Sequence, residues 1–210
     1  MFVTIGGNRF DFSKIDVDVQ ESGIENAFAK FDKMTLAQLI TQKKYEHLKI
    51  DTETLHPQLL DKAAGQAVQI MKDMGDPYYK QFLNNYGDMK YSKFVVRGNE
   101  ELLQKNGVYI IIVGNELVFS GVCARSFRER FNQHIGNISA KGCFRDGTAT
   151  HCHINAQITK KIDTCKVYFS ICPMNDKKEM NRLKNAIIKR FEPEWNLRTS
   201  KDKMEYLSNY

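Results

Sequence analysis

The sequence predicts an α+β protein, with a small, mainly antiparallel sheet flanked by helices behind a mostly helical N-terminal region. Three observations lead to this fold class. Apolar residues recur at helical spacing through most of residues 22–82. Two β-branched runs, 107–113 and 116–119, flank a tight turn. A final apolar-striped helix opens with a capping signature at Asp176.

Residues 1–104 are expected to be mostly helical. Residues 2–12 are the exception, because two short apolar runs surround Gly6-Gly7 and predict a pair of strands. Helix starts are predicted at four positions: Ser22, Thr35, Pro57 and Asp76. The helix after Pro57 is the longest of these and is expected to end near Gly75.

The second half changes character at Gly107. Gly114-Asn115 lies between the two β-branched runs and predicts a hairpin. After it we expect a capped helix from Ser126, a polar loop over Gly136–Thr150, a helix over His153–Lys161, a strand over Cys165–Cys172, and a last helix from Asp176 to Phe191, ended by Pro193. The expected domain covers residues 105–200, and residues 201–210 form a tail.

The composition is that of a soluble protein, and its charge distribution is compatible with nucleic-acid binding. The net charge of +6 is uneven: residues 1–105 hold 14 basic and 15 acidic side chains, and residues 106–210 hold 17 and 10. A basic half is typical of proteins that bind a phosphate backbone. The sequence shows neither an apolar run long enough for a membrane span nor a secretory signal. We therefore expect a cytoplasmic protein with no membrane partner.

Five cysteines without framework spacing indicate reduced thiols. The stretch containing Cys143, His151, Cys152 and His153 raises the alternative of a zinc site. It lacks a Cys-x-x-Cys pair, and adjacent ligands cannot easily share one tetrahedral ion. These two facts argue against zinc.

Three features of the second half could carry chemistry. Arg130 and His134 are four residues apart on one predicted helix, where one could clamp a phosphate while the other handles protons. A solvated helix face explains the same pair. Tyr109 begins the first strand, where a tyrosine usually belongs to the core. Lys184 falls within the apolar arc of the last helix, where it either extends along the edge of the core or marks a site.

The order and spacing of several short motifs in the second half resemble those of the GIY-YIG nuclease superfamily. Gly107-Val-Tyr109 and Phe119-Ser-Gly121 stand where its paired tripeptides would be, with Tyr109 and Phe119 ten residues apart. Arg130-x-x-x-His134 follows, and the last helix leads into Pro193-Glu-Trp195-Asn196. The resemblance covers residues 105–198, about half of the chain, and is strongest toward compact type II restriction endonucleases.

The resemblance implies a restriction-type endonuclease that hydrolyses phosphodiesters of double-stranded DNA by in-line attack of water and leaves 5′-phosphate ends. Tyr109 would be the general base, Arg130 would hold the scissile phosphate, His134 would position the nucleophile and Asn196 would support the site. One Mg²⁺ (or Mn²⁺) per site would be held by a glutamate of the last helix. Restriction-modification biology would add a homodimer, a palindromic site and a cognate DNA methyltransferase.

Two positions depart from the family pattern. Phe119 replaces the second tyrosine, so one hydroxyl is missing, and Lys184 stands where the metal-binding glutamate is expected. An ammonium group cannot ligate magnesium. We therefore expect this chain to be an inactive or impaired variant of an active nuclease. A lysine that grips phosphate in a metal-free binding protein is the rival account.

Further DNA contacts are expected from basic residues, namely Arg125, Arg128, Lys141 and Arg145. The loop Gly136–Thr150 could reach a DNA groove or be a flexible solvated loop. Residues 1–104 could contact DNA, dimerise or support the domain. The rival functions are a repair or homing nuclease, a catalytically silent DNA-binding module, and a toxin nuclease with an immunity partner.

Overall fold

The computed structural model describes residues 1–197 and confirms the α+β class, with antiparallel pairing in the sheets and helices beside them. The predicted tail, residues 201–210, lies outside the described residues. The chain forms two compact units, and neither is continuous in sequence. The first comprises Met1–Asp18, Val95–Phe131 and a segment beginning at Lys161; the second comprises Val19–Phe94 and Asn132–Lys160. The expected boundary after residue 104 therefore does not coincide with either unit.

The first unit opens with a hairpin, as the sequence predicted. Strands β1 (Phe2–Ile5) and β2 (Asn8–Asp11) pair antiparallel. Gly6 and Gly7 form the turn with φ of 56° and 81°, a left-handed conformation that is strained for residues with a Cβ atom.

The main sheet has the strand order β4-β3-β7-β5-β6. The hairpin β5 (Gly107–Val113) and β6 (Glu116–Cys123) turns at Gly114, and β5 also pairs antiparallel with β7 (Val167–Pro173). These three strands confirm the predicted hairpin and third strand. β3 (Ser13–Ile24) and β4 (Tyr91–Arg97) were not predicted.

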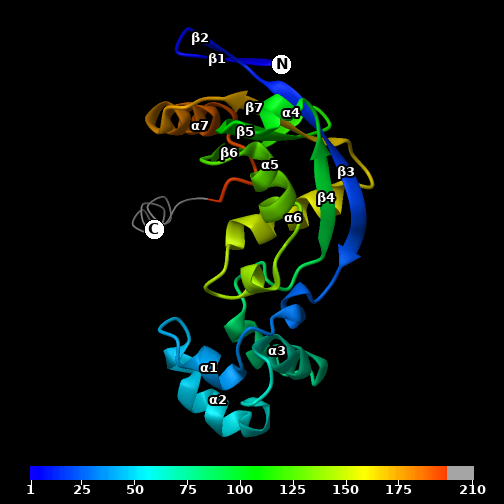
Figure 1. Cartoon of the computed structure of the whole chain (residues 1–210), viewed down its shortest axis with the longest axis vertical. Coiled ribbons are helices and arrows are strands. Elements are labelled where there is room, and N and C mark those ends of the chain that lie inside the picture. The colour runs from blue at the N-terminus through cyan, green and yellow to red at the C-terminus, as the bar shows by residue number, and fades with distance from the viewer. Residues whose placement is uncertain (198–210) are drawn as a thin grey trace, which may run out of the picture. The chain divides into compact units, whose positions relative to one another are not determined.

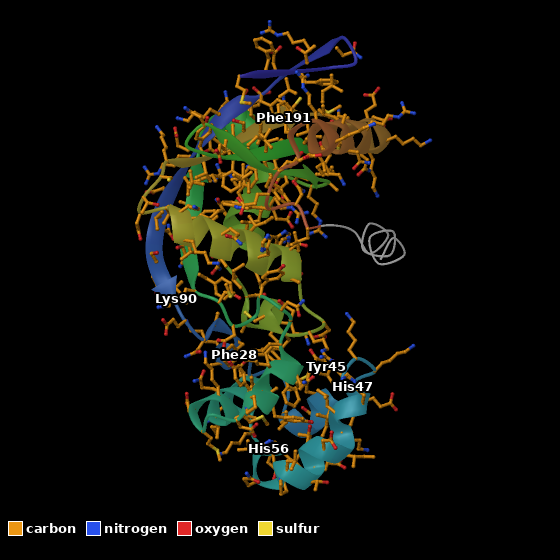
Figure 2. The ribbon with its side chains drawn as sticks, turned by 180° about the vertical axis from the view of Figure 1, so that it is seen from behind. Phe28, Tyr45, His47, His56, Lys90 and Phe191 are labelled. Atoms are coloured by element: carbon orange, nitrogen blue, oxygen red, sulfur yellow. The ribbon has the colours of Figure 1, made fainter. Side chains whose placement is uncertain are left out.

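Helix α7 (Lys177–Phe191) covers one face of this sheet (Figure 1). Asp176 caps it by accepting hydrogen bonds from the amides of Lys178 and Glu179 at 2.7 and 2.8 Å. Its apolar face packs on alternate residues of β5, with a shared core of Val108, Ile110, Ile112, Met180, Leu183 and Ile187. Phe191, which the sequence placed at the end of this helix, is 42% exposed there (Figure 2), and the Arg190 guanidinium lies over its ring.

The opposite face of the sheet packs against the segment after Ser126. A short helix, α5 (Phe127–Glu129), continues as a π-helix, η5 (Arg130–Ile135), where an α-helix was expected. Phe131 stacks on Phe169 of β7 with ring centroids 4.2 Å apart. A short helix, α4 (Glu100–Leu103), precedes the hairpin, and the carbonyl of Lys105 accepts a hydrogen bond from the Phe127 amide.

The second unit contains most of the predicted N-terminal helices. Thr35 starts α1 (Leu36–Ile40) with a complete capping box, as expected, and Leu36, Leu39 and Ile40 are buried. The helix predicted from Ser22 is wrong, because β3 continues to Ile24 and only a 3₁₀ turn, η1 (Ala27–Lys30), follows. Ser22 instead bonds Ser92 of β4, so strand pairing overrides the local capping signal.

The other helices of this unit are shorter than predicted. Two short helices, η2 (Glu46–Leu48) and α2 (Lys49–Leu55), precede Pro57. The single helix expected after Pro57 is divided into η3 (Pro57–Leu59) and α3 (Ala64–Asp73), which ends before Gly75. Asp76 begins a 3₁₀ helix, η4 (Pro77–Phe82). The division places Ala64 and Gly65 against the chain at 28–34, where a Cβ on Gly65 would lie 2.5 Å from the Phe28 carbonyl.

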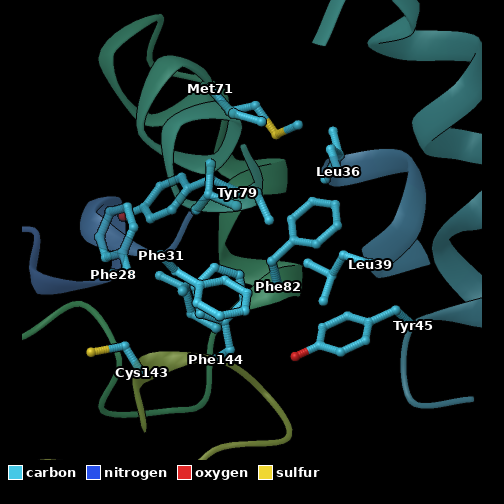
Figure 3. Packing of buried hydrophobic residues seen from close by; sticks show 14 of the residues in the cluster. Phe28, Phe31, Leu36, Leu39, Tyr45, Met71, Tyr79, Phe82, Cys143 and Phe144 are labelled. Carbon is cyan, nitrogen blue, oxygen red and sulfur yellow. The ribbon is translucent and has the colours of Figure 1, made fainter. Parts of the chain in front are cut away.

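An aromatic core holds the second unit together (Figure 3). Its rings come from segments far apart in the sequence: Phe28, Phe31, Tyr45, Tyr79, Phe82 and Phe144. The loop Gly136–Thr150 contributes Phe144 and Cys143, both fully buried, and forms the 3₁₀ helix η6 (Ala140–Cys143). A flexible solvated loop is therefore the wrong description of this segment. Helix α6 (Ala149–Lys161) follows it and starts four residues earlier than predicted.

Within residues 1–197 no helix is both long and apolar enough to cross a lipid bilayer.

Candidate functional site

The candidate site is built on the β5–β6 hairpin of the first unit. Gly107 begins β5 with φ of 152°, opposite Cys123 of β6 and Pro173 of β7. A Cβ at this position would lie 2.2 Å from the Cys172 carbonyl oxygen. The first glycine of the motif is therefore required by the close approach of β7 as well as by its own backbone conformation.

Tyr109 points away from α7, toward the face that carries Phe131. Its ring is 3% exposed and contacts Phe119 and Phe131, with centroids 5.8 and 5.2 Å apart. Gly121 lies directly opposite in the β5–β6 register. A Cβ on Gly121 would come within 2.6 Å of the Tyr109 ring carbon Cζ and 2.7 Å of its hydroxyl. The tyrosine of the first tripeptide thus requires the glycine of the second.

The charge state of Tyr109 follows from its surroundings. Burial raises the pKa of its hydroxyl, and the positive charge of Arg130 acts in the opposite direction without cancelling the shift. The phenol is therefore protonated near neutral pH. In this state it donates a hydrogen bond to a bound oxygen, and the general-base role implied by the resemblance requires a further nearby cation to lower its pKa.

Arg130 is the first residue of η5 and is half-buried. Besides acting on Tyr109, its guanidinium lowers the pKa of the Cys123 thiol by charge and by a hydrogen bond, although burial raises that pKa overall. Arg130 therefore lies beside both strands of the hairpin. A guanidinium and a phenol close enough to interact electrostatically can both donate to an anionic oxygen, through N–H and O–H groups.

Asn196 joins the C-terminal motif to the second tripeptide. Its side-chain oxygen accepts a hydrogen bond from the Ser120 amide and its side-chain nitrogen donates to the Ser120 carbonyl, both at 2.9 Å. The Trp195 amide donates to the Val118 carbonyl at 2.9 Å. β5 pairs with one edge of β6, and residues 195–196 form hydrogen bonds with the other edge. These bonds fix the position of Phe119, which lies between Val118 and Ser120.

Lys184 lies on α7, the helix that covers the other face of the sheet. Its neighbour Leu183 is buried against Val108 and Ile110, whereas Lys184 itself is half-buried. The structure therefore brings together Tyr109, Phe119 and Arg130 on one face and Asn196 at the edge, and it places Lys184 on a helix of the opposite face.

The residues present do not fit a magnesium ion. Lys184 carries an ammonium group, which has no lone pair to give to a metal. No group of three or more His, Cys, Asp or Glu side chains able to hold a metal is found within residues 1–197.

His134 lies in the second unit. Its ring stacks on that of His151, with centroids 5.3 Å apart and planes at 14°. Both rings line a pocket of about 240 Å³ that also exposes amide and hydroxyl side chains, among them Gln133, Asn137, Ser139 and Thr148. His151 entered the sequence analysis only as a zinc candidate, because nothing in the sequence indicates that it lies beside His134.

The four predicted DNA-contacting residues all have partners within their own unit. Arg125 is 78% exposed and pairs with Glu129 at 2.7 Å, and Arg128 pairs with Glu100. Lys141 pairs with Asp146 at 2.7 Å, and its ammonium lies over the rings of Phe31, Tyr45 and Phe144.

Arg145 is hydrogen-bonded to His47 at 2.7 Å. His47 is exposed, and Figure 2 labels it. Among Arg125, Arg128 and Lys141, Arg125 has the largest exposed fraction and is the most available of these three for an outside phosphate.

Sequence reasoning missed Gly121 as a partner of Tyr109, Cys123 as a neighbour of Arg130 and Ser120 as the partner of Asn196. The motif spacing contained a signal for Gly121, since a glycine in a buried strand often marks a close approach. Comparison of the chain with protein-family models, with curated proteins and with solved structures found no match.

Proposed function

We propose that this chain carries a nuclease domain of the GIY-YIG kind, acts on double-stranded DNA, and is inactive or impaired as it stands because of Lys184. One observation carries the proposal. Three motif pieces that are separate in the sequence lie at one hairpin: Tyr109 against Gly121, Arg130 acting electrostatically on Tyr109 and Cys123, and Asn196 bound to Ser120.

In this proposal Arg130 binds the non-bridging oxygens of the scissile phosphate and stabilises the charge that builds up as water attacks in line. The Tyr109 hydroxyl donates to the same phosphate or orients the water. Asn196 acts through the β6 backbone, because its side chain is occupied by Ser120. Lys184 stands where the resemblance expects the metal-binding glutamate, and its ammonium group cannot hold a metal ion, so no metal-dependent step is assigned to the chain as it stands.

Plasmid cleavage in magnesium tests the proposal with four chains: the chain as given, Lys184→Glu, Lys184→Gln, and Lys184→Glu combined with Arg130→Ala. We expect Lys184→Glu alone to convert supercoiled plasmid to nicked and linear forms. Lys184→Gln is the control: it removes the positive charge but does not add a carboxylate that could bind the metal ion. Loss of Arg130 should cut the rate at least about 100-fold, because it removes a donor to the transition state.

Two outcomes contradict parts of this proposal. Equal cleavage by the chain as given and by Lys184→Glu would show that Lys184 does not impair the enzyme. No cleavage by Lys184→Glu that still binds DNA would reject the nuclease and favour the second candidate.

The second candidate is a catalytically silent DNA-binding module. Lys184 favours it, because an ammonium group in place of the glutamate repels a metal ion and attracts a phosphate. Sequence specificity, a homodimer, a cognate methyltransferase and a cytoplasmic location remain predictions that follow from the restriction-enzyme resemblance.

A further inference from the structure

Two buried thiols lie beside each other in the second unit. Cys143 ends η6 and Cys152 lies near the start of α6, and both have no exposed surface. The Cys152 sulfur donates to the carbonyl of Gly142, the residue before Cys143, at 3.4 Å. An interaction between the two thiols shifts the pKa of each, and the Cys143 sulfur lies 3.9 Å from the Tyr91 hydroxyl.

The backbone around both cysteines is held in place. Asn84 donates from its side chain to the carbonyls of Gly142 and Phe144 at 2.8 and 3.1 Å, and its amide donates to the Cys143 carbonyl at 3.0 Å. On α6, Asn155 donates to the carbonyls of Ser92 and Ile135 at 2.7 and 2.6 Å. The backbone on both sides of the pair is therefore fixed by side-chain amides.

The two thiols differ in acidity. The hydrogen bond from Cys143 lowers the pKa of Cys152, and this effect exceeds the opposing effect of burial. The same hydrogen bond, together with burial, raises the pKa of Cys143. Cys152 also lines the neighbouring pocket, whereas Cys143 does not, so Cys152 is the sulfur placed to react first.

A pocket adjoins Cys152, although neither cysteine has exposed surface. Cys152 and Gly142 line the pocket of about 240 Å³ that also contains His134 and His151. A volume of this size exceeds that of a water molecule, about 30 Å³, several times over. In Figure 3 the Cys143 sulfur points away from the aromatic rings, so the thiol is at the margin of the core.

We propose that Cys143 and Cys152 form a redox-active dithiol that a hydroperoxide oxidises to a disulfide. The Cys152 thiolate attacks the terminal peroxide oxygen, an S–O bond forms, the O–O bond breaks, and the leaving oxygen takes a proton to become water or an alcohol. The Cys143 sulfur then displaces the hydroxyl from Cys152 and loses its own proton, so that an S–S bond forms and a second water leaves.

The other cysteines serve as internal comparisons. Cys123 and Cys172 are buried in the first unit, and burial raises the pKa of each. Cys165 is exposed and can be oxidised without any structural preparation. The proposal is independent of nuclease activity.

The test uses the whole chain with Cys165→Ser, which removes the exposed thiol. The native protein is treated with hydrogen peroxide, quenched, alkylated under denaturing conditions and digested. We expect two of the four remaining thiols to escape alkylation, a cross-linked peptide that joins Cys143 to Cys152 and has lost two hydrogen atoms, and full reversal by a dithiol reductant.

The matched variant adds Cys143→Ser. Without its partner, the Cys152 sulfenic acid should persist and be trapped by a cyclic 1,3-diketone, while Cys123 and Cys172 stay unmodified. Full alkylation of Cys143 and Cys152 after peroxide, or oxidation of all buried thiols at the same rate, overturns the proposal. If Cys143→Ser does not fold, the cross-link in Cys165→Ser alone decides the question.

Discussion

At the scale of single residues, the hairpin motif is explained by contacts between its two tripeptides. Gly121 has no side chain because the Tyr109 ring occupies the space a Cβ would need. Gly107 has none because the Cys172 carbonyl occupies the corresponding space. Phe119 keeps the ring contact to Tyr109 without the hydroxyl that the family places there. The motif therefore has a packing role that is separate from any catalytic one.

Asn196 offers a residue-scale prediction. Its side chain makes two hydrogen bonds to the Ser120 backbone at the edge of β6. Asn196→Ala leaves a partly buried amide and carbonyl without these partners, so the free energy of unfolding should fall by about 1–3 kcal/mol. Urea denaturation measures this change.

The control for Asn196 lies on the same C-terminal segment. Asn185 is exposed on α7, and Asn185→Ala should change the free energy of unfolding by less than about 0.5 kcal/mol. Equal losses in the two variants would mean that the β6 edge does not depend on the Asn196 side chain.

At the scale of elements, the helix starts with a side-chain cap were the most predictable. Thr35 and Asp176 were read from local sequence, and both accept hydrogen bonds from amides of the next turn. Ser22 has the same chemistry but bonds Ser92 instead, because β3 extends through it. A capping residue predicts a helix only where no distant strand competes for its backbone.

Helix α7 provides the element-scale prediction. Asp176 accepts from two amides at its start, and this helix buries Met180, Leu183 and Ile187 against β5. Asp176→Ala should lower the free energy of unfolding by about 0.5–2 kcal/mol, because both amides lose their acceptor. Thermal or urea denaturation of the whole chain reports the loss.

Asp176→Asn is the matched control, since its side-chain oxygen retains the cap and only the charge near the helix start is lost. We expect it to cost about 0.5 kcal/mol. If Asp176→Asn were as damaging as Asp176→Ala, the effect would arise from charge and not from the cap.

At the scale of the whole molecule, the chain forms two units from interleaved segments. The second unit takes residues 132–160 from the half of the sequence that resembles the nuclease family, and the first takes residues 1–18 from the other half. Each unit has an apolar core of its own, as the separate clusters around Phe82 and Ile110 show. The division of the sequence into a helical half and a sheet half is therefore only approximate.

The net charge of +6 leads to a whole-molecule prediction about DNA. If the basic residues contact phosphates, the logarithm of the affinity should fall with the logarithm of salt by about 0.9 per contact. With two or more contacts, the affinity for a labelled duplex should drop at least about tenfold between roughly 50 and 200 mM salt. Fluorescence anisotropy measures both values.

Arg125→Glu should weaken this binding and reduce its salt dependence, because the Arg125 side chain is 78% exposed and free to reach an outside phosphate. Lys90→Glu changes the net charge by the same amount at an exposed residue that was not predicted to contact DNA, and serves as its control. Equal effects would indicate a general charge effect, and an affinity independent of salt would contradict the DNA proposal.

The sequence by itself determined the fold class, the β5–β6 hairpin, α7 and the capped start of α1, because turn residues, caps and apolar periodicity are local signals. The family resemblance grouped Tyr109, Arg130, His134, Lys184 and Asn196 into one expected site, but His134 belongs to the second unit and Lys184 to α7. Only the tertiary structure decided that Ser22 lies in a strand and that Phe144 is in the core. It also decided that α7, which carries Lys184, covers one face of the sheet while the Tyr109 side chain points to the other face. These outcomes depend on pairing between segments far apart in the chain, which no local pattern encodes.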